Sequence, residues 1–187
     1  MDTVSSSNEE SALECVRFLF QQGYEAVAFF SQTIGSITPR ILRCKGYMRG
    51  IEEFAPEGTQ PEIYEFDSKD KRSCESSLKS FISKHPGKRI AIFASNGTSA
   101  QKLLSAFNTL GLKTGYELGL CTYDDWDWLE IASPSITAVA QGSSEIGARS
   151  AQLLLDTISG RRDIDSAPAN ILVPSKLSVK ESTPPSV

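Results

Sequence analysis

Apolar residues along the chain follow two different spacings. In five segments they recur every three or four residues, which predicts helices over residues 9–22, 38–54, 70–84, 100–110 and 146–158. Short apolar runs between these segments predict strands at residues 26–30, 63–66, 89–94, 118–121, 136–140, 171–173 and 177–179. Thr38 and Pro39 are expected to start the second helix, with Thr38 as its cap, and Gly111 is expected to end the fourth.

Strands and helices alternate, and the links between them are short. This pattern predicts an α/β fold, a three-layer arrangement in which a parallel sheet carries helices on both faces. Ligands of such sheets bind outside the carboxyl ends of the strands. Candidate functional residues are therefore expected in the four segments that follow strands: Ser31–Thr38, Ser95–Thr98, Thr122–Trp128 and Gln141–Ser144.

Composition narrows the function classes. The 187 residues carry a formal net charge of -4, so the chain as a whole has no electrostatic attraction for nucleic acid. The four cysteines form no C-x-x-C pair, and a single histidine excludes a His-rich metal site, so no metal or cofactor is expected. Scattered cysteines indicate reduced, buried thiols in a cytoplasmic protein. The first residues do not resemble a signal peptide, and no apolar run approaches the ~18 residues of a membrane span.

A set of short motifs, in a consistent order and spacing, resembles one family. The motifs are Asn8, Gly23-Tyr24, Arg43-Cys44-Lys45-Gly46-Tyr47, Ser95-Asn96-Gly97, residues 110–120, Tyr123-Asp124-Asp125, Pro134–Gln141, Glu145-Ile146-Gly147 and Val173–Thr183. Together they are similar to the effector-binding domain of the lactose-repressor (LacI/GalR) family of transcription regulators. The resemblance covers Ser7–Thr183, with Lys180 standing where the family usually has arginine.

This resemblance implies a partial periplasmic-binding-protein-like fold of type I. Asn8 matches a point after the family's DNA-binding domain and most of its first subdomain, so operator DNA would be contacted only through a domain outside this chain. Residues 8–140 would form the second subdomain, and residues 141–170 a segment of the first. Residues 1–7 would be a lead-in, residues 171–183 terminal strands, and residues 184–187 a disordered tail. The full protein would be a homodimer.

The family binds its small-molecule effector between the two subdomains, which makes five residues candidate ligand contacts. Asp124 can accept two sugar hydroxyls, or it is a surface turn residue beside Asp125. Asn96 can donate to one sugar oxygen and accept from another, or it caps a helix. Arg43 can fork onto hydroxyls or a carboxylate, or it is a solvated helix charge.

The two remaining candidates lie after the last two strands of the repeated pattern. Gln141 falls at the crossover to the first subdomain, where it either meets the ligand or bonds to backbone as a hinge residue. Trp126 either stacks on the apolar face of a sugar ring or makes a packing or subunit contact, and packing is favoured for Trp128. The Asp-Trp-Asp-Trp loop resembles that of ketogluconate-type regulators. The predicted ligand is therefore a small carbohydrate or a sugar acid.

The predicted function is that of a cytoplasmic, sugar-responsive regulator, and two other classes of protein are alternatives to it. One is a periplasmic or extracellular sugar-binding protein of the same fold, which the absence of a signal peptide and the regulator-like end of the chain oppose. The other is an α/β enzyme that uses Asp124 and Asp125 as paired carboxylates. Adjacent residues at a strand end point in different directions, and the chain has no nucleophile elbow, P-loop or G-x-G-x-x-G motif. No enzymatic activity is therefore expected.

Overall fold

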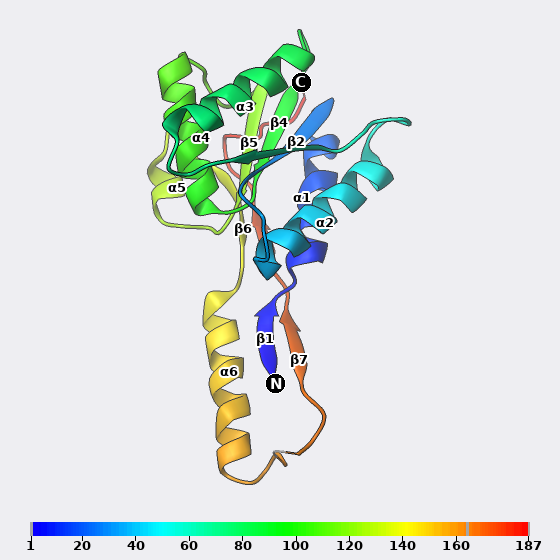
Figure 1. The fold of residues 1–187 in the computed structure, drawn as a ribbon, viewed down its shortest axis with the longest axis vertical. Coiled ribbons are helices and arrows are strands. Elements are labelled where there is room, and N and C mark those ends of the chain that lie inside the picture. Colours follow the sequence, from blue (N-terminus) through cyan, green and yellow to red (C-terminus); the bar gives the residue numbers. More distant parts are fainter. Residues whose placement is uncertain (1, 164, 187) are drawn as a thin grey trace.

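The computed structural model describes residues 2–163 and 165–186, which form a large α/β part and a smaller extension beneath it (Figure 1). The helices are α1 (Asn8–Gln21), α2 (Thr38–Phe54), α3 (Lys71–Lys84), α4 (Gly97–Leu110), α5 (Trp128–Ile131) and α6 (Ser143–Ile158). The strands are β1 (Thr3–Ser6), β2 (Ala26–Gln32), β3 (Glu62–Phe66), β4 (Ile90–Ala94), β5 (Leu118–Tyr123), β6 (Thr137–Ala140), β7 (Asn170–Val173) and β8 (Lys176–Ser178).

The large part is built on a six-stranded sheet in the order β3-β2-β4-β5-β6-β8. The first five strands in this order, β3, β2, β4, β5 and β6, are parallel, and β8 pairs with β6 as an antiparallel edge strand. The central strand β4 is buried along its whole length, as expected for a strand covered on both faces. All parallel strands therefore end at the same edge, which faces the smaller extension (Figure 1).

Helices cover both faces of this sheet, as predicted. On one face α1 and α2 pack over Phe29, Phe93 and their neighbours, and on the other α3 and α4 pack over Phe30 and Ile92. The first pair of helices approaches unusually closely, because a Cβ atom at Gly46 would collide with the backbone carbonyl of Glu9. This contact anchors the start of α2, which carries Arg43, against the start of α1.

The smaller extension consists of β1, β7 and α6. Strands β1 and β7 form a two-stranded parallel sheet, and α6 lies beside them (Figure 1). Its apolar residues Leu154, Leu155 and Ile158 are exposed, and no described residue of α6 is buried. The division of the chain into subdomains, with residues 141–170 assigned to the first, stays a prediction.

The helices and strands predicted from the sequence are present, with some local differences. Thr38 is not a cap, because α2 begins at Thr38 itself, Ile37 precedes it as the N-cap, and no side chain caps the end. The short helix α5 was not predicted. Residues 1–7 are not merely a lead-in, since Thr3–Ser6 form β1. The terminal strands also separate, with β7 pairing with β1 and β8 with β6.

The predicted disordered tail is the remaining difference, and it is wrong for residues 184–186. The carbonyl of Pro184 accepts a hydrogen bond from Arg89, and the N–H of Ser186 donates to the carbonyl of Gln22. These contacts hold the tail against the Arg89 side chain, just before β4, and against the end of α1. Val187 lies outside the described residues. Among the described residues, no helix is both long enough and apolar enough to cross a membrane.

Candidate functional site

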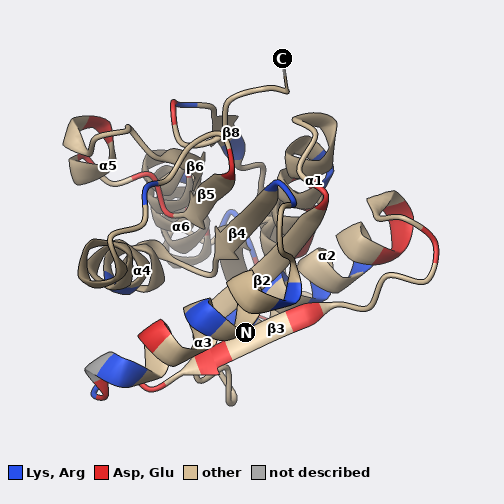
Figure 2. Cartoon of the chain, turned by 90° about the horizontal axis from the view of Figure 1, so that it is seen from above, with Lys and Arg blue, Asp and Glu red and all other residues tan. Residues whose placement is uncertain are grey.

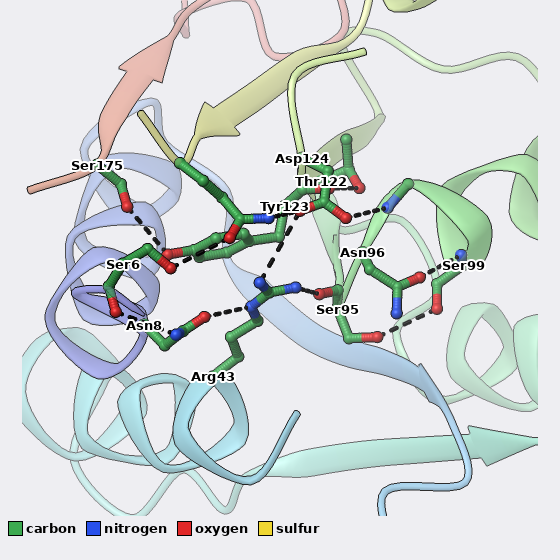
Figure 3. A network of polar contacts seen from close by, with 12 residues as sticks. Ser6, Asn8, Arg43, Ser95, Asn96, Ser99, Thr122, Tyr123, Asp124 and Ser175 are labelled. Atoms are coloured by element: carbon green, nitrogen blue, oxygen red, sulfur yellow. Dashed lines mark hydrogen bonds and ion pairs between the residues drawn. The ribbon is translucent and has the colours of Figure 1, made fainter. Parts of the chain in front are cut away.

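Asp124 lies directly after β5, at the edge of the sheet that faces the small extension. Its backbone φ is 74°, a left-handed conformation that aspartate tolerates better than most residues, and its N–H donates to the carbonyl of Val139. The Oδ2 atom accepts the N–H of Gly97 at 3.3 Å, at the start of α4. This turn therefore directs the carboxylate across the strand ends and toward the other polar side chains (Figure 3).

Arg43 reaches the same place from α2, and its side chain is buried. Its Nε donates to Oδ1 of Asn8 at 2.8 Å, and Nη1 donates to the carbonyl of Ser95 at 2.7 Å. Its Nη2 lies 3.9 Å from Oδ1 of Asp124, and the guanidinium stacks on Tyr123 (Figure 3). Burial lowers the pKa of Arg43, and the charge of Asp124 opposes that shift. Arg43 is thus not a solvated helix charge, because each part of its guanidinium meets another group.

Gln141 connects the large part to the extension. Its Nε2 donates to the carboxylate of Asp124, and its Oε1 accepts the hydroxyl of Ser6 at 3.2 Å, at the end of β1. Asn8 completes the connection, since its Nδ2 donates to the carbonyl of Ser6 at 3.1 Å. The side chain of Gln141 bonds to side chains, so the alternative of a backbone-bonding hinge residue does not describe it.

Asn96 caps α4, as the helix-cap alternative predicts. Its Oδ1 accepts the N–H of Ser99 at 2.8 Å, and its Nδ2 donates to Oε1 of Gln32 at 3.1 Å. Arg40 donates to the same Gln32 oxygen. Both ends of the Asn96 amide are therefore occupied within the chain, and a ligand would compete with Gln32 for it.

Trp126 has 41% of its surface exposed and lies against the start of α4. A Cβ atom at Gly97 would be 2.7 Å from the Trp126 ring, so only glycine admits the indole at this distance. Trp128 instead packs against the core under α4, in line with the packing prediction. A shallow cavity of about 210 Å³ opens beside Trp126 and is lined by Asp124, Asp125, Trp126, Ala140, Gln141, Gly142 and Ser143.

Three of the five predicted contacts, Asp124, Trp126 and Gln141, line this cavity. Arg43 and Asn96 do not line it. Arg43 approaches it through the Asp124 carboxylate. Within residues 2–163 and 165–186, acidic, histidine and cysteine side chains gather nowhere in a group that could hold a metal ion. The arrangement offers hydrogen-bonding groups beside an aromatic face.

Residues 16–183 match the model of the periplasmic binding protein-like domain. The chain belongs to this family. Within the family, the chain has the sequence and fold of the effector-binding domain of LacI-type regulators, so the resemblance seen in the sequence motifs is confirmed.

The curated relatives of this family member are transcription regulators. The chain is 31% identical over 182 residues to the HTH-type transcriptional regulator KdgR of Bacillus subtilis. The aligned region covers 97% of this chain and 52% of KdgR. It is 26% identical over 186 residues to the HTH-type transcriptional regulator PtxS of Pseudomonas aeruginosa, and the aligned region covers 98% of this chain and 52% of PtxS. The chain thus spans about half the length of these relatives.

Solved structures confirm the periplasmic binding protein-like fold. A LacI family transcriptional regulator from Enterococcus faecium with bound ribose superposes with a TM-score of 0.80 at 20% identity, covering all of this chain and 67% of that one. The transcriptional regulator CelR in complex with cellobiose superposes with a TM-score of 0.76 at 21% identity. The match covers 97% of this chain and 54% of the CelR chain.

Four residues beside the predicted ligand contacts of this periplasmic binding protein-like domain were not predicted as parts of its site. They are Ser6, Asn8, Tyr123 and Ser175. Ser6 bonds to Gln141 and Asn8 to Arg43. Tyr123 lies against the Arg43 guanidinium, and its hydroxyl bonds to Ser175 at 3.1 Å (Figure 3). Asn8 at the start of a helix was visible as a motif residue, but nothing nearby in sequence shows that it meets Arg43. Ser6 is brought near Ser175 by the pairing of β1 with β7, in which Ser6 lies opposite Val173.

Proposed function

We propose that the chain is the ligand-sensing part of a LacI-type transcription regulator and binds a small carbohydrate or sugar acid at the Asp124 cavity. The hydrogen-bonded connection from Asp124 through Gln141 to Ser6 carries this proposal. It places a charged acceptor at the carboxyl edge of the sheet and links it directly to the smaller part. A ligand that bonds to Asp124 would therefore change the contacts between the two parts.

Each residue of the cavity has a distinct role in this proposal. Asp124 accepts sugar hydroxyls, and Gln141 offers a donor and an acceptor beside it. The exposed face of Trp126 packs on the apolar face of the sugar ring. Arg43 holds the Asp124 carboxylate in place, because its own hydrogen bonds fix it to α1 and β4.

Regulation follows from differential binding, with no covalent chemistry. A ligand shifts the arrangement of the two parts only as far as it binds one arrangement more tightly than the other. In a homodimer with a DNA-binding domain this shift would alter operator affinity. The names of the curated relatives support a regulator, and the four buried free cysteines suit the cytoplasm.

A sugar-binding protein of an uptake system is the alternative function, because it would use the same fold. The relatives favour the regulator, since those found at 26–31% identity over nearly the whole chain are HTH-type regulators. The regulator and the uptake protein share the same ligand site, so the test of the cavity applies to both.

The test is a tryptophan fluorescence titration with ribose, cellobiose, gluconate and 2-ketogluconate. We expect one of them to give a saturable change, with a Kd on the order of 1 µM or weaker. Asp124→Asn retains the left-handed backbone but removes the charge, and should weaken binding at least tenfold, about 1.5 kcal/mol or more. Asp127→Asn, in the same loop but exposed, should bind as the parent does.

Two results would contradict the proposal. Equal affinity of Asp124→Asn and the parent for the best ligand would place the site elsewhere. Equal weakening by Asp124→Asn and Asp127→Asn would show a general charge effect of the loop instead of a contact by Asp124.

A further inference from the structure

A second, larger hollow lies at the opposite end of the sheet from the Asp124 cavity. It has a volume of about 610 Å³ and lies between the connection from α3 to β4 and the connection from α4 to β5. These connections meet at the amino ends of the two strands, and Figure 2 looks onto this end of the molecule. We call this hollow the amino-end groove.

The groove combines an apolar floor with an aromatic rim. The apolar residues that line it are Ile82, Pro86, Ile90, Leu112 and Leu118. Tyr116 stands at the rim with 46% of its surface exposed. A volume of this size falls within the usual range of roughly 300–1,000 Å³ for small-molecule sites. The floor and rim therefore suit a ligand with a ring or another compact apolar body.

The charge of the groove is opposite to that of the chain. Lys88, Arg89 and Lys113 line it, against Glu117 as its acidic residue, in a chain whose net charge is -4. Among the described residues, no carboxylate lies within 4.0 Å of the amino group of Lys88 or Lys113. His85 also lines the groove, but its Nε2 is paired with Glu62.

Arg89 is held rigidly at the wall of the groove. Its guanidinium donates to the carbonyls of Gln22, Tyr116 and Pro184 and lies between two tyrosine rings, 4.4 Å from Tyr24 and 4.1 Å from Tyr116. Glu25 accepts the backbone N–H of Arg89, and among the described residues no carboxylate forms an ion pair with its side chain. The positive charge of Arg89 therefore remains uncompensated by a salt bridge beside the two lysines.

The carboxyl ends of α3 and α4 offer a structural explanation for these bases, because helix carboxyl ends attract cations. Backbone N–H groups bond to some of the carbonyls at those ends. The N–H of His85 bonds to the carbonyl of Ile82, and the N–H groups of Gly111 and Leu112 bond to carbonyls in the last turn of α4. The backbone N–H of Lys88 bonds to the carbonyl of His85, the C-cap residue of α3, at 3.3 Å. In the described part of the chain the side chains of Lys88 and Lys113 donate to no helix carbonyl, so capping by their amino groups does not account for them.

We propose that the amino-end groove binds a small organic anion, a phosphate or carboxylate carried on a ring or other apolar body. The apolar body rests on the floor against Tyr116, and the anionic group lies between Lys88 and Lys113. This site is separate from the Asp124 cavity and would give the domain a second ligand site.

The test is an NMR titration of the 187-residue chain at pH 7 with three probes: phenyl phosphate, inorganic phosphate and phenol. Phenyl phosphate should produce saturable shifts at the amides of Gly87, Gly111 and Leu112, with a Kd on the order of 1 mM or tighter. Inorganic phosphate has the anionic group without the ring, and phenol has the ring without the anionic group. Each should bind at least tenfold more weakly than phenyl phosphate.

Matched variants separate the groove from general charge effects. Lys88→Gln with Lys113→Gln should weaken phenyl phosphate binding at least fivefold, whereas Lys45→Gln with Lys79→Gln removes the same charge from exposed helix positions and should change nothing. Tyr116→Ser should weaken phenyl phosphate but leave inorganic phosphate unaffected. The proposal is overturned if shifts do not saturate, if both lysine pairs have equal effects, or if the shifts cluster at Asp124 and Trp126.

Discussion

The guanidinium carbon of Arg43 lies 3.6 Å from the centroid of the Tyr123 ring. This stacking joins α2 to the end of β5, one residue before Asp124. Because Arg43 also bonds to Asn8 and Ser95, one buried side chain connects α1, α2, β4 and β5 at the ligand-facing edge. A planar guanidinium suits this position, since it donates in several directions within its plane while its face covers the ring.

Replacing Arg43 with lysine should therefore destabilise the chain although the charge is retained. Lysine cannot reproduce the forked hydrogen bonds or the stacking, and it would leave polar groups of Asn8 and Ser95 unpaired. We expect a loss of about 3 kcal/mol in the free energy of unfolding, measured by urea denaturation. Arg49→Lys, at an exposed position beside Glu9 and Glu10, is the control and should change stability little. Equal effects of the two variants would contradict the buried role of Arg43.

Gly46 in α2 and Gly147 in α6 should respond oppositely to the same substitution. Gly46→Ala forces a Cβ atom into the backbone of α1 and should lower the free energy of unfolding by about 2 kcal/mol. Gly147→Ala meets no atom within 4 Å and should raise it by about 0.5–1 kcal/mol, because alanine favours the helix. Urea midpoints of both variants measure this. If Gly46→Ala is neutral, α1 and α2 are farther apart than described.

The exposed apolar face of α6 should make the chain self-associate. Leu154 and Ile158 are 61% and 73% exposed, and Leu172 of β7 is also exposed nearby in the small extension. Sedimentation velocity should show a dimer or a larger species, and Leu154→Ser with Ile158→Ser should shift it toward monomer. Ile131→Ser removes an exposed apolar residue from the unrelated helix α5 and serves as the control. A parent chain that stays monomeric at all concentrations would refute this prediction.

Acid should destabilise the chain partly through Glu62. Burial opposes ionisation of this carboxyl, but hydrogen bonds from Tyr64, His85 and Lys84 outweigh it and hold the pKa of Glu62 below its usual value. A carboxyl whose pKa is lowered by folding stabilises the native state above its unfolded pKa, and this contribution is lost as the pH falls through the folded value.

The measurement is the urea midpoint between about pH 5 and pH 3, where an unfolded glutamate with a pKa of about 4.3 takes up its proton. The parent should lose stability more steeply over this range than Glu62→Gln, which has no charge to lose. Glu57→Gln, at an exposed position, should follow the parent curve. Parallel curves for the parent and Glu62→Gln would show that Glu62 makes no such contribution.

Local chemistry explains why most elements could be predicted. Gly111 ends α4 in the left-handed conformation that glycine allows, and Asn96 caps the same helix, so both boundaries were visible in a few adjacent residues. The alternating pattern also placed Asp124 and Gln141 after their strands. The short segment Thr3–Ser6, with one apolar residue, carried no comparable signal, because its strand depends on Asn170–Val173, far along the chain.

The sequence by itself determined the order of helices and strands, the parallel three-layer fold and the segments that hold candidate ligand contacts, because these depend on residue spacing and on the shared direction of parallel strands. Only the tertiary structure decided what those side chains do. In it the Asn96 amide donates to Gln32, and the buried Arg43 guanidinium stacks on Tyr123. Gln141 bonds to both Asp124 and Ser6. Such partners depend on contacts between residues remote in sequence, which no local pattern encodes.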